Sequence, residues 1–309
     1  MERLLLPALI VLTNLAAHAQ VGPVYHWLLD EDAGAVAHEW VGGSHGTLTD
    51  GALWDPAGGR HGGAVRFDGV DDRILAGPCD LTNGGTGITL ALWVKPDFVT
   101  GMDRTILAKA HGPQVNDAIW SITFVNASSI RFRLRTGGTV AELNTGPSSI
   151  FNGVWYHVVA SYDGAHMRVH VNGALMGSLA RSGSIGFHPT AGVSMAALGN
   201  GTQPFSGWLD DVRIYDRGLT EMEIIDLLFA NVPTHVETAS PTPRQAGLLG
   251  CPSGAWEQVT VLDATGRVTY EAVTLTGDAP MPLANLPSGM HLLRLRTGDR
   301  KCVRKVHIP

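Results

Sequence analysis

Short runs in which apolar and polar residues alternate recur throughout the first 215 residues of the chain. A period of two is the pattern of a half-buried β-strand, and no helical period interrupts it before Leu219–Phe229. Strands without crossover helices pair antiparallel, and about a dozen of them close into a sandwich or a barrel. The predicted strands are Val24–Asp30, Ala64–Phe67, Arg73–Leu75, Ile88–Lys95, Thr105–Lys109, Ala118–Val125, Ile130–Arg135, Val154–Tyr162, His166–Val171, Ala174–Leu179, Val193–Gly199 and Gly207–Tyr215.

One hairpin and one helix are marked most clearly. Asp163-Gly164 lies between two alternating runs, which indicates a two-residue turn that sets His157 opposite His170. Such a histidine pair is either a surface pair or a site for a transition metal. Further along, Thr220 and Glu223 have the spacing of a capping box, so a helix over 221–229 is expected to begin there and to pack on the sandwich.

Composition and charge limit the classes of function. The 38 glycines and 17 prolines show no Gly-X-Y period, so they indicate turns between strands rather than collagen. A net charge of −6 argues against nucleic-acid binding, which needs a basic face. Residues 239–309 carry eight Lys or Arg and five Asp or Glu. The excess of negative charge therefore lies in residues 1–238. There the carboxylates either bind divalent cations or form a solvated surface.

The N-terminus has the pattern of a secretory signal peptide over residues 1–19. Arg3 precedes the apolar run Leu4–Leu12, and Ala17-His18-Ala19 is a small-residue motif that predicts cleavage between Ala19 and Gln20. The run is too short to span a bilayer, and the alternative is a buried first helix or an anchor. We therefore predict a secreted or cell-surface protein that passes through the periplasm and has no transmembrane segment in the mature chain.

A proline-rich segment divides the rest of the chain in two. Residues 232–245 hold three prolines and follow the helix signal, which is the composition of a linker. The expected domains are a large β-domain over 20–231 and a small one over 246–309. Cys251 and Cys302 either form a disulfide, which leaves Cys79 free, or all three cysteines stay unpaired.

Four segments of the large domain, in order, resemble a known family. They are Gly63–Asp72 (GAVRFDGVDD), Ile88–Pro96 (ITLALWVKP), Trp155–Gly173 (WYHVVASYDGAHMRVHVNG) and Phe205–Leu219 (FSGWLDDVRIYDRGL). With these, residues 24–230 resemble the concanavalin A-like, laminin-G-like jelly rolls (LamG type 3) of bacterial secreted proteins. The resemblance implies an all-β, antiparallel jelly-roll sandwich. It leaves function open, because this fold hosts lectins, adhesins, glycosidases and accessory modules.

The last 70 residues read as a second, small β-sandwich. Alternating runs flank turns at Ala264–Gly266 and Pro287–Gly289, and the last strand, Lys301–Pro309, is rich in lysine and arginine. With Val259–Val268 and Leu286–Leu295, this region resembles the type A C-terminal sorting domain of the Bacteroidetes type IX secretion system. The resemblance implies an export signal that the type IX machinery recognises. An ordinary appended β-domain is the alternative.

Two neighbouring carboxylates indicate a metal site. Asp210 and Asp211 lie side by side in the last predicted strand, where they repel each other unless a cation or an arginine neutralises them. The resemblance implies that the first strand lies beside this one and that Asp210 holds the place of a calcium ligand, with Asp30 facing it. Because oxygen ligands suit Ca²⁺, we predict a structural calcium at Asp30, Asp210 and Asp211. An ion pair with Arg213 or Arg217, or exposure to solvent, is the alternative.

Three arginines indicate a place for a ligand. Arg131, Arg133 and Arg135 alternate along one strand, so their guanidinium groups project from one face, where they suit carboxylates and sulfates. Trp120 on the preceding strand offers a ring on which a sugar could stack. These four residues are the predicted ligand-binding site for an anionic glycan. The alternative is a solvated sheet face with core aromatics.

The remaining acidic clusters give weaker signals. Asp68, Asp71 and Asp72 lie in a glycine-containing turn, where bonding to backbone amides is favoured over a cation or a sugar. A glycosidase active site of this fold would need two carboxylates on one strand. The crowded acidic run Glu221–Asp226 falls on the predicted helix instead. We therefore predict a secreted, non-catalytic protein that binds carbohydrate or another surface ligand. The alternatives are a glycoside hydrolase of jelly-roll fold and a structural adhesin that acts by protein contacts.

Overall fold

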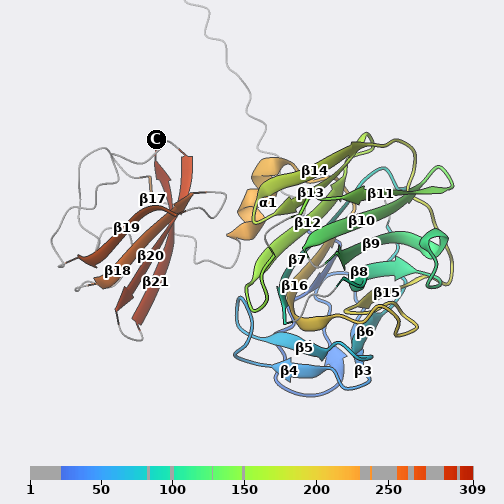
Figure 1. Ribbon diagram of the computed structural model, residues 1–309, viewed down its shortest axis with the longest axis horizontal. Helices are drawn as coiled ribbons and strands as arrows, with labels where there is room; N and C mark the ends of the chain where they lie inside the picture. Colours follow the sequence, from blue (N-terminus) through green and yellow to red (C-terminus); the bar gives the residue numbers. More distant parts are fainter. Residues whose placement is uncertain are drawn as a thin grey trace, which may run out of the picture.

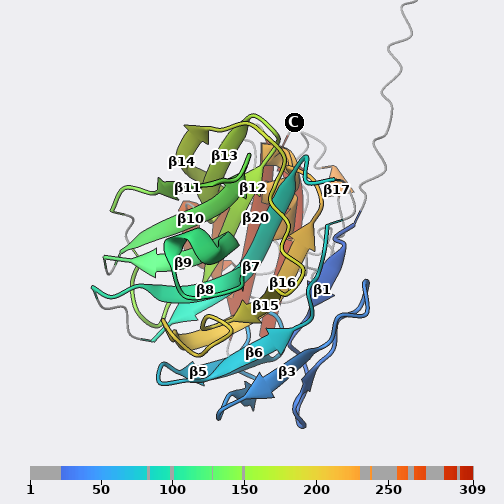
Figure 2. The ribbon, with the colours of Figure 1, turned by 90° about the vertical axis from the view of Figure 1, so that its right-hand side faces the viewer.

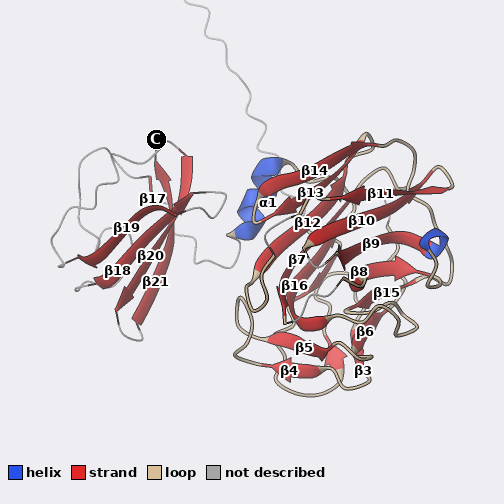
Figure 3. Ribbon diagram, in the orientation of Figure 1, coloured by secondary structure: helices blue, strands red, loops and turns tan. Residues whose placement is uncertain are grey.

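The protein is built almost entirely from β-strands. A computed structural model describes residues 22–81, 84–97, 101–126, 128–147 and 150–229, and in the C-terminal segment residues 237–238, 256–263, 268–275, 289–297 and 300–308. Within this part of the chain the helical elements are α1, Glu221–Leu228, and a single 3₁₀ turn, Val115–Asp117 (Figure 3). The all-β prediction is confirmed.

Two eight-stranded antiparallel sheets form the large domain (Figure 1). Sheet A has the order β14-β13-β12-β7-β16-β5-β4, and β1 also pairs with β16; sheet B has the order β11-β10-β9-β8-β15-β6-β3-β2. The strands of sheet A are β1 (Tyr25–Trp27), β4 (Leu53–Asp55), β5 (Ala64–Asp68), β7 (Ile88–Pro96), β12 (Tyr156–Tyr162), β13 (His166–Val171), β14 (Ala174–Ala180) and β16 (Ser206–Tyr215). The strands of sheet B are β2 (Val36–Ala37), β3 (Gly46–Thr49), β6 (Arg73–Ala76), β8 (Arg104–Ala110), β9 (Ala118–Val125), β10 (Ser129–Thr136), β11 (Thr139–Asn144) and β15 (Gly192–Met195).

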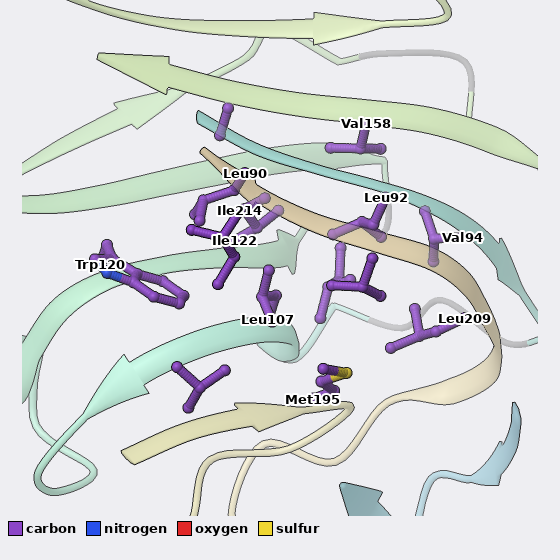
Figure 4. Packing of buried hydrophobic residues seen from close by; sticks show 14 of the residues in the cluster. Leu90, Leu92, Val94, Leu107, Trp120, Ile122, Val158, Met195, Leu209 and Ile214 are labelled. Atoms are coloured by element: carbon purple, nitrogen blue, oxygen red, sulfur yellow. The ribbon is translucent and has the colours of Figure 1, made fainter. Parts of the chain in front are cut away.

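The hydrophobic core lies between the two sheets (Figure 4). Sheet A contributes the inward residues of β7 and β16, among them Leu90, Leu92 and Leu209, and sheet B contributes Trp120 and Ile122. Each such side chain stabilises the fold by roughly 1.5–3 kcal/mol when it is buried. Because side chains alternate along a strand, the intervening residues point to the outer faces of the sandwich, where any binding site of the sheets must lie.

The first and last strands of the large domain lie side by side (Figure 2). β1 pairs with the second half of β16, so that His26 lies opposite Arg213, while β5 pairs with the first half of β16. This adjacency was predicted, and it is confirmed. The short strands β2, β3, β4 and β11 were not predicted, because they are two to six residues long and carry few apolar side chains.

The register predicted for the hairpin after β12 is wrong by two residues. Ser161 pairs with Arg168 and Val159 with His170, so His157 does not lie opposite His170. The Asp163 carboxylate accepts hydrogen bonds from the amides of Ala165 and His166, which stabilises a longer turn than Asp-Gly alone requires. A shift of two leaves every side chain on its predicted face, since the period of a strand is two.

The helix begins as predicted. Thr220 is its N-cap and forms a capping box with Glu223, whose carboxylate also pairs with Arg217. The buried residues Ile224 and Leu227 pack against Ala91 of β7 and Val159 of β12, so α1 covers part of the outer face of sheet A (Figure 1).

The described strands of the C-terminal segment form one sheet. Its order is β17-β21-β20-β18-β19, from β17 (Glu237–Thr238), β18 (Trp256–Asp263), β19 (Val268–Leu275), β20 (Gly289–Thr297) and β21 (Arg300–Ile308). The small sandwich therefore stays a prediction. The signal peptide with its cleavage site Ala19-Gln20, most of the linker and Cys251 lie outside the described residues, while Cys79 is free and buried. Among the described helices, none has the length and hydropathy needed to cross a membrane.

Candidate functional site

The two adjacent aspartates of β16 point to different partners because the strand carries a bulge between them. The register of β16 against β7 shifts between Asp210 and Arg213, and Asp211 has a φ of 51°. Aspartate is among the residues that adopt this left-handed conformation most readily. The bulge directs the Asp211 carboxylate to Arg213 and to β1, while Asp210 accepts hydrogen bonds from the loop before β5.

Asp211 forms a buried ion pair. Arg213 donates from Nε to its Oδ1 at 2.9 Å and from Nη2 to its Oδ2 at 2.8 Å, and the ring Nε2 of His26 lies 2.6 Å from Oδ1. Burial by itself raises the pKa of Asp211, but the His26 hydrogen bond and the Arg213 guanidinium outweigh it and hold the pKa below its usual value. The arginine ion pair that the sequence left as an alternative to calcium is therefore present.

Asp210 is the less fully hydrogen-bonded of the two carboxylates. Its Oδ2 accepts the backbone amides of Arg60 at 2.7 Å and His61 at 3.0 Å, whereas its buried Oδ1 has no hydrogen-bond partner among the described residues. Burial is the main cause that raises the pKa of Asp210, to about 7, and the nearby charges of Asp211 and Asp30 add to it. Asp30 in turn accepts the amide of Gly63 at 2.7 Å.

The predicted calcium ligands are thus mostly engaged by donors of the protein itself. Both oxygens of Asp211, one of Asp210 and one of Asp30 accept hydrogen bonds, which a hard cation would have to displace. These hydrogen bonds fit a strand junction, and the calcium ion at these three residues stays a prediction.

A different acidic group has the geometry that a metal needs. Oxygens of Asp68, Asp71 and Asp72 lie within 4.8 Å of one another, at the turn after β5. Asp68 accepts the amide of Val70 and Asp72 accepts the amide of Asp68, as turn chemistry predicts. The Oδ1 atom of Asp72, a residue that is 3% exposed, has no hydrogen-bond partner in the part of the chain that the structure describes. This aspartate triad could therefore bind a metal ion.

The predicted glycan site on β10 is not assembled as expected. The three arginines do share the outer face of sheet B, but Arg131 pairs with Asp103 at 2.6 Å and Arg133 with Glu142 at 2.7 Å, while Arg135 donates to backbone carbonyls. Trp120 pairs with Leu134 and so points the opposite way, into the core (Figure 4). The expectation that its ring lies beside the guanidinium groups is wrong. Trp120 pairs with Leu134, and residues next to each other in a strand, such as Leu134 and the arginines on either side of it, point to opposite faces of the sheet.

Trp120 instead lines a small hollow. The space holds about 210 Å³ and is lined also by Cys79, Lys109 and Phe187. Lys109 donates to Asp80, and burial raises the pKa of the Cys79 thiol to about 12, so neither group is a free ion or a nucleophile here. Phe187 at the rim is 68% exposed.

The outer face of sheet A carries the most distinctive group of accessible side chains. Arg66 of β5, Trp208 of β16 and Lys95 of β7 are cross-strand neighbours, and Trp155 lies just before β12. The Lys95 ammonium lies 3.8 Å from the ring centroid of Trp208 and 5.4 Å from that of Trp155. The Arg66 guanidinium lies 5.1 Å from the Trp208 ring. We call these four residues the tryptophan ladder.

The Trp208 ring has its orientation set by a hydrogen bond. Its indole Nε1 donates to Asp55 Oδ2 of β4 at 2.8 Å, and Arg66 and Lys95 lie over the ring. Arg66 is only loosely paired, with Asp97 Oδ2 at 3.9 Å. An indole that is held in place before a ligand arrives loses little conformational freedom on binding.

Beside the ladder, the same face of sheet A is closed. Trp93 lies opposite both Asp210 and His157, the Arg60 guanidinium lies 4.7 Å from its ring centroid, and Leu228 packs on it from α1. Burial lowers the pKa of His157 to about 3, so this histidine is neutral and part of the packing. The ladder is therefore the accessible part of this face next to the region that α1 and Arg60 cover.

The family profile of the concanavalin A-like lectin/glucanases superfamily (Laminin_G_3) matches residues 67–225. The chain belongs to this superfamily. The match includes Trp155, Trp208 and Lys95 of the ladder, and it ends within α1.

Solved structures share the concanavalin A-like fold. Domain 4 of an extracellular arabinanase of Geobacillus stearothermophilus, solved in complex with arabinotriose, has 21% identity and a TM-score of 0.53, over 67% of this chain and 98% of that domain. The binding domain of Paraclostridial Mosquitocidal Protein 1 has 14% identity and a TM-score of 0.56, over 90% and 65%. The receptor-binding domain of a botulinum neurotoxin C/D mosaic has 11% identity and a TM-score of 0.54, over 91% and 72%. No curated protein matches the sequence significantly.

The ladder was missed at the sequence level although the signal is present. Trp208 and Asp210 are outward positions of the same alternating run, and Lys95 is the polar position of the ITLALWVKP segment. A half-buried tryptophan at the polar position of a strand, as Trp208 is, is unusual enough to mark a surface site. Its neighbours Arg66 and Lys95, however, come from strands distant in sequence.

Proposed function

We propose that this chain is a secreted, non-catalytic protein whose concanavalin A-like domain binds carbohydrate at the tryptophan ladder. The observation that carries the proposal is the pair of indoles, Trp155 and Trp208, on the accessible part of the outer face of sheet A with Lys95 between them. Sugar rings place their C–H faces on indoles, and neighbouring charged groups bond the hydroxyls. The arabinanase domain of the same fold, solved with arabinotriose, supports this class of ligand.

Export belongs to the same proposal. The signal-peptide pattern over residues 1–19 supports entry into the periplasm, and the resemblance of residues 246–309 to a type A sorting domain supports passage through the type IX machinery to the outside or to the cell surface. A protein on that route meets glycans of its surroundings, which agrees with a ladder of half-buried indoles on the outer face of sheet A.

Replacing Trp208 by alanine tests the site. The full chain is run in native gels that contain a polysaccharide which slows the migration of the wild type. We expect the variant to migrate without retardation, because one indole and the hydrogen bond that orients it are removed. A loss of at least tenfold in affinity is the expected scale. Phe187→Ala, an exposed aromatic at the rim of the hollow in sheet B, is the matched control and is expected to bind as the wild type does.

Two outcomes contradict the proposal. If Trp208→Ala binds normally while Phe187→Ala does not, the ligand site is the hollow. If the wild type releases new reducing ends from the bound polysaccharide, the protein is a glycoside hydrolase and the non-catalytic part of the proposal fails.

We propose calcium as the ion of the aspartate triad. Three close carboxylates repel one another, and the described residues place no cation within ion-pair distance of them. A hard cation with oxygen ligands relieves this repulsion. Saturating calcium is expected to raise the melting temperature of chelator-treated protein by about 5 °C, since an ion that binds only the folded state stabilises it.

Two variants locate the ion by calorimetry. In the described part of the chain, the carboxylates that bond the turn's amides are those of Asp68 and Asp72. Asp71→Asn is therefore expected to abolish the calcium effect without disturbing the turn, while Asp210→Asn is expected to leave it intact. A melting temperature that is the same with calcium and with chelator would end this proposal.

A further inference from the structure

We infer that the tryptophan ladder selects acidic polysaccharides, that is, chains that carry carboxylate or sulfate groups, and that Lys95 is the residue that makes this selection. The inference rests on the proposed function and names the class of ligand for the same site. It differs from the sequence-based expectation, which placed an anionic glycan on the arginines of β10.

The first reason is the state of the Lys95 charge. Several other cations on the sheets have carboxylate partners: Arg131 with Asp103 at 2.6 Å, Arg133 with Glu142 at 2.7 Å, and Lys109 with Asp80. Arg104 and Arg135 donate to backbone carbonyls instead. Within the described part of the chain, the Lys95 ammonium has contacts with the two indole rings and no carboxylate within ion-pair distance. Its three N–H donors therefore lack an anionic acceptor until a ligand supplies one.

The second reason is that Asp55, a carboxylate beside the ladder, is already engaged. Asp55 accepts the indole N–H of Trp208 at 2.8 Å, and its Oδ2 atom lies against Gly58, where an added Cβ would come within 2.0 Å of it. Asp55 therefore cannot swing toward Lys95 without breaking the bond that orients the ring. Asp97, the other carboxylate near the ladder, lies 3.9 Å from Arg66, whose side chain is 55% exposed.

The third reason is the setting of this charge in an acidic protein. The chain has a net charge of −6, so a cationic centre between two stacking platforms is a local feature and not a by-product of general basicity. A lysine is a compact point charge, which accepts either a planar carboxylate or a tetrahedral sulfate. Because Lys95 and Arg66 lie over the Trp208 ring, a sugar that reaches the two indoles meets the Lys95 ammonium, to which it can present its acid group.

Binding is to be measured by isothermal titration of the full chain at low salt, with polygalacturonate as the carboxylate probe, dextran sulfate as the sulfate probe, and arabinan and dextran as neutral probes. We expect at least one acidic polysaccharide to bind about tenfold more tightly than the neutral ones, and this preference to fall as salt is added. The two acidic probes distinguish carboxylate from sulfate recognition.

Lys95→Met removes the charge and keeps the apolar length that packs between the rings. It is expected to reduce binding of the acidic polysaccharide to the level of the neutral ones, about tenfold, and to leave neutral binding unchanged. Arg168→Met removes one positive charge elsewhere on the outer face of sheet A and is expected to change nothing. If Lys95→Met does not fold, as judged by near-ultraviolet circular dichroism, Lys95→Gln replaces it.

The outcomes separate this inference from the proposed function. Equal binding of acidic and neutral polysaccharides, with Lys95→Met unaffected, overturns the inference and leaves glycan binding at the ladder in place. An equal loss in Lys95→Met and Arg168→Met also overturns it, because the attraction is then a long-range effect of net charge. Absence of binding to all four polysaccharides, or normal binding by Trp208→Ala, overturns the proposed function itself.

Discussion

Asp211→Asn is expected to destabilise the large domain by about 3 kcal/mol at pH 7. The substitution keeps the size of the side chain and its tolerance of the left-handed φ of 51°. It removes the charge that neutralises Arg213, which stays buried beside β1 next to the ring of His26 and the side chain of Tyr215. A buried charge that loses its partner costs far more than the pair contributed. Urea unfolding followed by fluorescence measures the loss.

Asp50→Asn is the matched control for this variant. Asp50 also has a left-handed φ, of 62°, and also pairs with an arginine, Arg73 at 2.7 Å, but its carboxylate is exposed. An exposed pair contributes at most about 1 kcal/mol, so the control separates the effect of burial from that of backbone conformation. Equal losses in the two variants would show that the junction of β1 and β16 does not depend on the buried ion pair.

The pH dependence of the Asp211 effect has a definite sign. Because its folded-state pKa lies below the unfolded value of 3.8, the ion pair contributes its full stability above pH 3.8, and this contribution is lost as the pH falls through the folded-state pKa. The difference in unfolding free energy between wild type and Asp211→Asn is therefore expected to stay constant from pH 5 to pH 8 and to decrease only at acidic pH.

The neighbouring substitution Asp210→Asn is expected to stabilise the protein, in contrast to Asp211→Asn. Burial raises the folded-state pKa of Asp210 to about 7 from 3.8, so the folded protein holds a proton there that the unfolded chain has lost. Stability from this group is complete below about pH 4 and falls as the pH rises toward 7. An asparagine does not titrate, and its Oδ1 can accept the same two amides of Arg60 and His61. We expect the unfolding free energy of the variant to be higher than that of the wild type by on the order of 4 kcal/mol at pH 8 and to equal it at pH 4.

Unfolding free energies at these two pH values test the prediction. Asp97→Asn, at an exposed and loosely paired carboxylate, serves as the control and is expected to change stability by less than about 1 kcal/mol at both. A loss of stability in Asp210→Asn at pH 8 would contradict the prediction. It would mean that the folded protein needs the charged carboxylate, as a cation bound at this position would require.

Much of the fold follows from local pattern alone. Alternation in the predicted runs Ile88–Lys95 and Val154–Tyr162 indicates strands, which the structure has at Ile88–Pro96 and Tyr156–Tyr162. In the second run it also predicts that Tyr156, Val158, Ala160 and Tyr162 share one face, and all four lie in the core. The capping box at Thr220 is a local signal of the same kind. The hairpin at Asp163-Gly164 shows the limit of such signals, because the Asp163 side chain stabilises a longer turn and shifts the register by two residues.

The sites depend on information that no single strand holds. The sequence by itself determined that Trp208 and Lys95 take outward positions and that Asp210 and Asp211 are adjacent carboxylates. Only the tertiary structure decided that β16 lies between β5 and β7, which brings Arg66, Trp208 and Lys95 into one row, and that a bulge sends the two aspartates to different partners. The physical reason is that alternation along a strand fixes the face of a side chain, whereas its neighbours across the sheet are set by long-range strand order and by where the register slips.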